Sequence, residues 1–181
     1  MEFEQVVRKR FMCRSYEDRE VPDEVLDRIL DLAARYPSAG HTQPQEFIVI
    51  RDTATKLQLA RAALDQMYVA EAPVDVVVVS DTRRSYARYR ERGVSFYSII
   101  DGAFAAMLLM LAAINEGLGA AFVGAFDDDQ VRAVLGLPQV IRPIGIVPIG
   151  YCAEPPQKLP RRPRDEIIHY ERWRDSLGVV P

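Results

Sequence analysis

The stretch from Phe96 to Glu116 constrains the fold most, because its apolar residues lie nearly all the way round a helix. A helix without a polar face has to be covered on more than one side. Its most apolar part, residues 102–114, is shorter than the ~18 to 20 residues that span a bilayer. We therefore expect a long central helix buried in the protein core, and no membrane partner. In a chain of 181 residues, covering such a helix often takes a second subunit.

The run VDVVVV, residues 74–79, consists almost entirely of β-branched residues. Such a run is typical of a strand that is buried on both faces, so it predicts the central strand of a sheet. Other apolar runs predict three further strands, which are EFIVI (46–50), AAFVG (120–124) and RPIGIVPIGY (142–151).

Helical patterns account for much of the remaining chain. In VPDEVLDRILDLAARYP, Pro22 begins and Pro37 ends an amphipathic helix. The apolar face of this helix contains Val25, Leu26, Ile29, Leu30 and Ala33. Residues 54–67 have helical composition, and Asp127 predicts the cap of a helix that ends at Gly136.

Two segments are less regular. Residues 82–95 are charged and aromatic, which leaves two alternatives, an exposed helix or a mobile excursion beside the site. The end of the chain predicts a proline-rich arm and a short amphipathic helix, and such arms often wrap a neighbouring subunit. Taken together, the elements predict an α+β fold with one sheet covered by helices, in a single domain over residues 1–181.

Composition excludes several classes of protein. The chain is 49% hydrophobic and 27% charged with a net charge of −3, which is typical of a soluble globular protein and gives no sign of a nucleic-acid partner. Cys13 and Cys152 are too few and too far apart in sequence for a disulfide framework or a CxxC metal site, so a cytoplasmic location is expected. The first residues lack the apolar segment of a signal peptide.

Motif searches exclude other chemistries. The chain has no G-x-S-x-G elbow, and its only histidines are His41 and His169, so neither a catalytic triad nor a metal site is expected. The glycines of GLGAAFVG end a helix and open a strand, which is the reverse of a dinucleotide-binding fingerprint. They are better explained as a helix C-cap.

Basic residues gather near both ends of the chain. They are Arg8, Lys9, Arg10 and Arg14 on one side and Lys158, Arg161, Arg162 and Arg164 on the other. The two clusters could converge on one anion, such as a phosphate. The alternative is ordinary solvated surface charge.

The order of the motifs resembles the nitroreductase family from end to end. It begins with RFMCRSY (10–16) and continues with PSAGHTQP (37–44), GLGAAFVGAFDDDQVRAVLGLP (117–138) and RRPRDEIIHYERW (161–173). This resemblance implies an α+β fold and an obligate homodimer with FMN at the subunit interface and the C-terminal arm exchanged between subunits. It also implies hydride transfer from NADH or NADPH to a small acceptor, such as a nitroaromatic or a quinone, by a ping-pong mechanism.

The resemblance also assigns roles to matching positions. Arg10 and the backbone of Phe11 and Met12 would lie near the ribityl phosphate, and Arg14 would lie against the pyrimidine edge of the flavin, where it stabilises the reduced ring. The arm residues Arg161 and Arg162 would close over the phosphate.

A second set of implied contacts concerns the flavin ring. Pro37, Ser38, Ala39 and His41, followed by Gln43, would lie against the ring from the partner subunit, and the backbone N–H groups of Gly124 and Ala125 would face N5. His41 is a weak candidate for a catalytic acid, because its ordinary pKa lies near neutrality; the other interpretation is a hydrogen-bonding substitute for the family's usual Asn.

Departures from the family pattern leave some positions open. Phe11 and Met12 stand where Arg and Ser are usual, and Gln45 stands where Trp is frequent. The Asn that often helps to hold the flavin has no obvious match, and Gln66 is the candidate for it. Alternative functions are a specialised branch that fragments flavin, dehalogenates or dehydrogenates, or a flavin-binding module without turnover. A deazaflavin could also replace FMN.

Overall fold

A computed structural model describes residues 1–156 and 159–174. Its strands are β1 (Gln45–Ile50), β2 (Val74–Asp81), β3 (Gly119–Ala120) and β4 (Ile141–Gly150). The helices before β2 are α1 (Phe3–Lys9), α2 (Asp23–Ala33), the 3-10 turn η1 (Ala39–His41), α3 (Thr53–Ala62) and α4 (Tyr68–Glu71). Those after β2 are α5 (Thr82–Arg92), the π-helical turn η2 (Gly93–Tyr97), α6 (Ser98–Asn115), α7 (Asp128–Leu135) and α8 (Arg164–Ile167).

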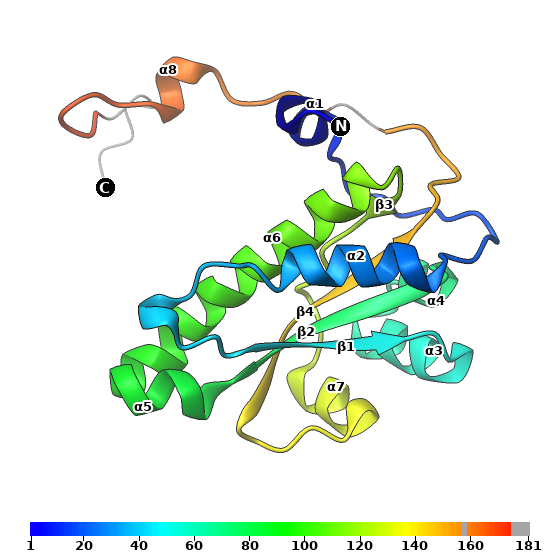
Figure 1. Ribbon diagram of the computed structural model, residues 1–181, viewed down its shortest axis with the longest axis horizontal. Coiled ribbons are helices and arrows are strands. Elements are labelled where there is room, and N and C mark those ends of the chain that lie inside the picture. Colours follow the sequence, from blue (N-terminus) through cyan, green and yellow to red (C-terminus); the bar gives the residue numbers. More distant parts are fainter. Residues whose placement is uncertain (157–158, 175–181) are drawn as a thin grey trace.

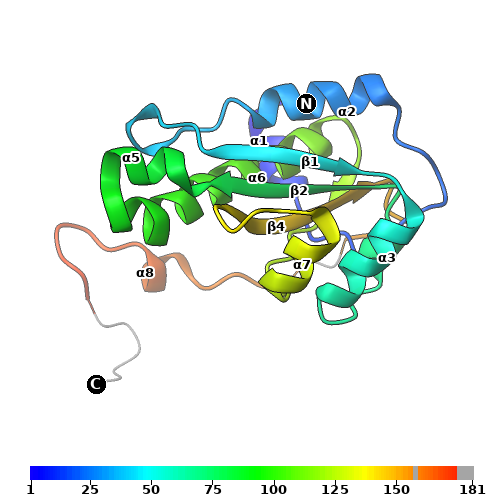
Figure 2. The same ribbon diagram turned by 90° about the horizontal axis from the view of Figure 1, so that it is seen from below.

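The sheet confirms the predicted central strand. Its strands run in the order β1-β2-β4-β3, and every neighbouring pair is antiparallel. All eight residues of β2 are buried, because the sheet is covered on both faces. Figures 1 and 2 show α2 and α6 on one side of the sheet and α3 and α7 on the other.

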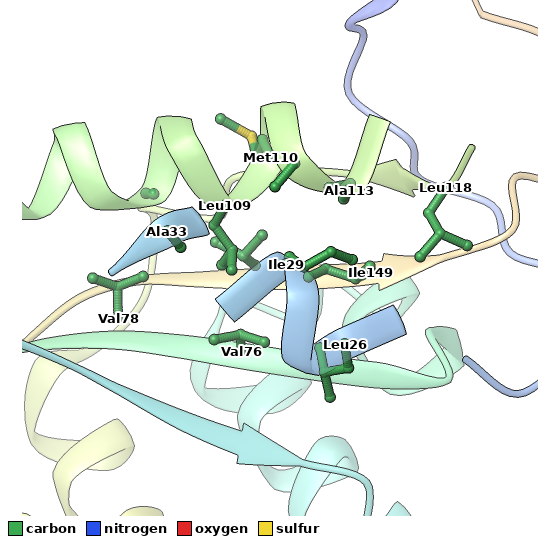
Figure 3. Close-up of a cluster of buried hydrophobic side chains, with 14 of the residues drawn as sticks. Leu26, Ile29, Ala33, Val76, Val78, Leu109, Met110, Ala113, Leu118 and Ile149 are labelled. Carbon is green, nitrogen blue, oxygen red and sulfur yellow. The ribbon is translucent and has the colours of Figure 1, made fainter. Parts of the chain in front are cut away.

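The valine side chains of β2 point alternately to the two faces of the sheet and pack in a core on each face. Val76 and Val78 pack with Ile29 of α2 and Leu109 of α6 (Figure 3). The intervening Val77 and Val79 pack in a second core under α3 and α7. The α+β architecture predicted from the sequence is therefore confirmed.

The long apolar helix is a core helix, as predicted, although the argument from its length was wrong. Helix α6 has 18 residues, and the helical stretch Thr82–Asn115 to which it belongs is long and apolar enough to cross a membrane, by length and composition only. Its buried side chains, including Ala105, Leu109 and Ala113, instead pack against the sheet and α2. Tertiary packing explains the apolar composition of this helix.

Several element boundaries differ from the predicted ones. Helix α3 ends at Ala62, before the predicted residue 67, because Leu64 and Asp65 adopt positive φ angles of 58°. The predicted strand 120–124 is reduced to Gly119–Ala120 and one isolated bridge between Val123 and Ile146. The segment 82–95 is helical, with α5 interrupted at Arg90 (φ 51°). Asp127 and the left-handed Gly136 (φ 64°) cap α7 as predicted.

Cys13 and Cys152 form a disulfide, so the expectation that these two cysteines give no disulfide framework was wrong. They are 139 positions apart in sequence. The fold brings them together because Cys13 donates its backbone N–H to the carbonyl oxygen of Ala120 in β3, while Cys152 lies two residues after the end of the neighbouring strand β4. A side chain at Gly119 would overlap the sulfur of Cys152. The glycine therefore makes room for the bridge.

The disulfide should stabilise the protein mainly by restricting the unfolded chain. For a bridge across so many residues, we expect Cys152→Ala to lower the free energy of unfolding by about 2–4 kcal/mol under non-reducing conditions. Urea unfolding should show that reductant lowers the midpoint of the unsubstituted protein and leaves that of the variant unchanged. Equal midpoints for the oxidised protein and the variant would contradict the bridge.

The buried carboxyl group of Asp75 should make the free energy of unfolding depend on pH. Its side chain is fully buried in β2, and neither carboxylate oxygen has a hydrogen-bond partner among the described residues. Burial raises the pKa of Asp75 to about 8, against the opposing effect of the Lys56 charge. Since the folded protein then binds this proton more tightly than the unfolded chain does, stability should fall as the pH rises from about 4 to 8. Urea titrations across this pH range should show a smaller decrease in the free energy of unfolding for Asp75→Asn than for the unsubstituted protein. The same dependence on pH in both proteins would contradict the assignment.

Candidate functional site

The segment Arg10–Arg14 runs along the edge of the sheet beside β3. Met12 forms a parallel bridge with Ala120, and Tyr16 fixes the end of the segment by donating its hydroxyl to the carbonyl oxygens of Cys13 (2.8 Å) and Pro148 (3.1 Å). Burial raises the pKa of Tyr16, so the hydroxyl keeps its proton and remains a donor. Tyr16 belongs to the RFMCRSY motif, but nothing in that motif predicted this role.

A cavity of about 900 Å³ opens beside this segment and is called here the basic cavity. Its lining residues are Arg8, Lys9, Arg10, Phe11, Met12, Cys13, Arg14, Ser15, Glu154, Pro155, Pro156, Leu159 and Arg161. The structure thus brings Arg161 of the arm to the same cavity as Arg10 and Arg14. This convergence of two distant basic clusters was one of the two alternatives left open by the sequence.

The charges of the basic cavity are poorly compensated. Arg8 pairs with Glu4 at 2.7 Å, but within the described part of the chain Lys9, Arg10, Arg14 and Arg161 form no ion pair. Glu154 is the single carboxylate in the lining. Several guanidinium groups around one cavity form a donor set for an anion, and for a phosphate in particular.

The second arginine of the arm lies differently. Arg162 donates to Glu166 at 3.2 Å within the arm and is not part of the cavity lining. Lys158, from the same predicted cluster, lies outside the described residues. Of the two predicted arm contacts, the structure places only Arg161 at the basic cavity.

A chain of side chains connects the basic cavity with the segment after β3. The guanidinium of Arg14 lies 6.0 Å from the ring centre of Tyr68, whose hydroxyl donates to Gln66 at 2.7 Å. The Gln66 amide in turn donates to the carbonyl oxygen of Ala125 at 3.1 Å. Gln66, a candidate from the sequence, therefore fixes one of the two backbone positions that were predicted to face the ligand.

Gly124 and Ala125 are exposed, and their amides remain available. Across residues 1–156 and 159–174, neither backbone N–H has a hydrogen-bond acceptor. The two amides before them are occupied: that of Val123 donates to the carbonyl oxygen of Ile146 at 2.9 Å, and that of Phe122 donates to the sulfur of Met12 at 3.4 Å. Two free N–H groups in succession form a site for an electronegative ligand atom.

The loop Pro37–Gln43 lies elsewhere in the chain. Gly40, His41 and Gln43 have positive φ angles of 54°, 56° and 45°, an arrangement that costs energy for the two residues with side chains. His41 is exposed, and its ring makes no hydrogen bond to the described residues. The loop is thus a strained, outward-facing surface.

Asp101 holds this loop in place. Its carboxylate, at the beginning of α6, accepts the backbone N–H of Ala39 with 3.1 Å to each oxygen. Burial raises the pKa of Asp101, while the hydrogen bond from Ala39 opposes the shift. Asp101 directly precedes the apolar segment 102–114, and no role was assigned to it from the sequence. A lone carboxylate in the first turn of such a helix was the available signal.

The loop and the basic cavity lie at opposite ends of α6. The loop contacts Asp101 in the first turn, whereas the amino terminus before the Arg10–Arg14 segment donates to Asn115 in the last turn. Eighteen helical residues span roughly 27 Å, and Figure 1 shows this separation. The predicted site residues of one chain therefore form two groups that cannot contact one small ligand together.

Comparisons with known proteins agree with this geometry. The family model described as the nitroreductase family matches residues 7–74 and 68–151. A curated relative, the NADH dehydrogenase of Thermus thermophilus, is 34% identical over 187 residues, covering 88% of this chain and 91% of the relative. The FMN reductase (NADPH) of Bacillus subtilis is 27% identical over 169 residues, covering 86% and 68%.

A solved structure extends the likeness to three dimensions. The crystal structure of a nitroreductase family protein from Clostridium difficile 630 is 32% identical, covers 96% of this chain and 100% of its own, and superposes with a TM-score of 0.86. The family match spans most of the chain, including the Arg10–Arg14 segment, the Pro37–Gln43 loop and the amides of Gly124 and Ala125. The chain therefore belongs to the nitroreductase family.

Proposed function

We propose that this protein is an NAD(P)H-dependent oxidoreductase that binds FMN as a homodimer and reduces a small acceptor, such as a nitroaromatic or a quinone, by a ping-pong mechanism. The observation that carries the proposal is the basic cavity, which Arg161 of the arm completes. The names of the relatives support the same class, because they include an NADH dehydrogenase and an FMN reductase.

The residues present fit FMN. Uncompensated guanidinium groups suit the phosphate, and a cavity of about 900 Å³ is large enough for a ligand of this size. The free amides of Gly124 and Ala125 suit a ring nitrogen that accepts hydrogen bonds. FMN, when bound, supplies the ring that takes hydride from the nicotinamide and passes it to the acceptor.

The protein's own groups would bind and orient the cofactor. Arg10 and Arg161 would hold the phosphate, and Arg14, steadied by the Tyr68 ring, would place positive charge at the pyrimidine edge. A fixed positive charge there stabilises negative charge on the ring. His41 needs no part in proton transfer under this proposal, since it makes no contact that would aim its ring.

A second subunit would complete the site. The Pro37–Gln43 loop lies roughly one length of α6 from the basic cavity, so it would reach the flavin of the partner. Apolar side chains exposed on this chain support such an interface: Phe104 and Met107 of α6 are 46% and 43% exposed, and Trp173 of the arm is 73% exposed. A cytoplasmic location is part of the proposal, because NADH and NADPH are available there.

An absorbance spectrum tests the proposal directly. The purified protein should carry a chromophore with maxima near ~375 and ~450 nm that bleaches when NADH or NADPH is added without oxygen. Arg10→Ala combined with Arg161→Ala should weaken FMN binding by more than about tenfold, since charged phosphate contacts contribute ~1.5 to 3 kcal/mol each. Arg51→Ala, which alters an arginine paired with Asp23 at 2.9 Å, is the control.

Failure of the purified protein to take up added FMN would overturn the proposed function. Equal FMN affinity of the double variant and the Arg51→Ala control would overturn the phosphate assignment alone.

Asp101 should act as a positioning residue for the loop. Asp101→Leu removes the acceptor of the Ala39 N–H, whereas Asp101→Asn keeps an oxygen in the same place. We expect the leucine variant to lose about tenfold or more in kcat, because a buried hydrogen bond to a charged group is worth ~1.5 to 3 kcal/mol. Steady-state kinetics and the visible circular dichroism of the bound flavin should both separate the two variants. Identical kcat and dichroism would contradict the role.

A further inference from the structure

Helix α5 packs directly against the strained loop. Arg84 donates its Nε to the carbonyl oxygen of Thr42 at 2.9 Å, and Arg88 donates an Nη1 proton to that of Gly40 at 3.1 Å. The contact is close, since a Cβ at Gly40 would overlap the side chains of Arg88 and Tyr89. Two guanidinium groups are therefore fixed beside the exposed surface of the loop.

These guanidinium groups keep most of their donors free. A guanidinium carries five N–H groups, and each of these two uses one for a loop carbonyl. Among the described residues, neither Arg84 nor Arg88 has a carboxylate within ion-pair distance. Their neighbour Arg83, in contrast, is paired with Asp81 at 2.8 Å.

Positive charge predominates in the segment that carries the pair, although the Arg84 charge also acts on the Asp81 carboxylate, whose pKa is lowered first by the Arg83 hydrogen bond and further by Arg84. Segment 82–97 contains five arginines and one glutamate in a chain whose net charge is −3. Aromatic side chains lie among the cations: the guanidinium of Arg88 is 5.7 Å from the ring centre of Tyr89, and that of Arg92 is 4.7 Å from that of Phe96. Exposed arginines are usually solvated and mobile, but the two carbonyl contacts restrict Arg84 and Arg88 before any ligand arrives. Such preorganisation lowers the entropy cost of binding.

We propose that Arg84 and Arg88 form an anion-binding pair that selects, among the molecules reaching the flavin, those that carry a phosphate or carboxylate group. This inference rests on the proposed function, because the loop beside the pair is the part that would face the partner's flavin. The anion can come from two sources, the 2′-phosphate of NADPH or a carboxylate on an aromatic acceptor. Both present the oxygens that a guanidinium fork binds in pairs.

Matched substrates test the pair. In the flavin-loaded dimer we compare kcat/KM for NADPH with that for NADH, and for 4-nitrobenzoate with that for 4-nitrobenzamide. Arg84→Gln with Arg88→Gln should lower the preference for the anionic member by about tenfold or more. Arg84→Lys with Arg88→Lys should retain part of it, and Arg83→Gln is the control on the same helix. General damage to the loop should lower kcat/KM equally for both substrates of a couple and leave the ratio of the two values unchanged.

Each outcome decides a separate point. If the double glutamine variant loses its preference only for NADPH over NADH, the pair binds the 2′-phosphate. If it loses its preference only for 4-nitrobenzoate over 4-nitrobenzamide, the pair binds the carboxylate. If neither ratio changes while the neutral substrates still react, the pair does not bind anions.

A binding measurement covers the case in which the protein shows no turnover, which would count against the proposed function alone. Calorimetric titration with 2′,5′-ADP and with 5′-AMP, and with 4-nitrobenzoate and 4-nitrobenzamide, needs no reaction. The protein should bind at least one anionic member more tightly than its counterpart, the double glutamine variant should bind both members alike, and added salt should reduce the preference. Equal affinity within both couples for the unsubstituted protein would overturn the proposal.

Discussion

The packing of α6 against the sheet and α2 is the interaction on which the rest of the structure depends. Leu109 on this helix, Ile29 on α2 and Val76 on β2 are fully buried in one core. Removing any of them from that core would cost several kcal/mol, which is a large part of the stability of a small domain. The same packing positions the loop, through Asp101, and the amino-terminal segment, through Asn115.

The length of α6 therefore sets the geometry of the candidate site. One end of the helix holds the Pro37–Gln43 loop, and the basic cavity lies toward the other end. A single chain presents both halves but cannot bring them to one ligand. Under the proposed function, a second copy would supply the missing half through the exposed apolar residues on α6 and the arm.

The chemistry of the site depends on fixed positive charge and on backbone amides. Lys9, Arg10, Arg14 and Arg161 line the basic cavity and form no ion pair among the described residues. The successive N–H groups of Gly124 and Ala125 have no acceptor among residues 1–156 and 159–174. Arg84 and Arg88 extend the positive charge to the loop, where each is aimed by a backbone carbonyl. Under the proposed function this arrangement would orient FMN, which supplies the hydride chemistry, so no strongly perturbed acid or base of the protein would be needed.

The sequence by itself determined the local elements. The β-branched run fixed β2 as the buried central strand, Asp127 and Gly136 bounded α7, and the apolar stretch before Glu116 defined a core helix. These patterns depend on neighbours a few residues away, which is why they can be recognised in one dimension. The order of motifs also placed the chain in its family.

Only the tertiary structure decided which distant residues meet. The pairing of Cys13 with Cys152, the contact of Gln66 with Ala125 and the support of the loop by Asp101 join segments that no local pattern connects. The two basic clusters were visible in the sequence, but only folding showed that Arg161 reaches the cavity while Arg162 pairs with Glu166. The physical reason is that such contacts depend on how helices and strands pack against one another, and packing is set by the whole core rather than by any single segment.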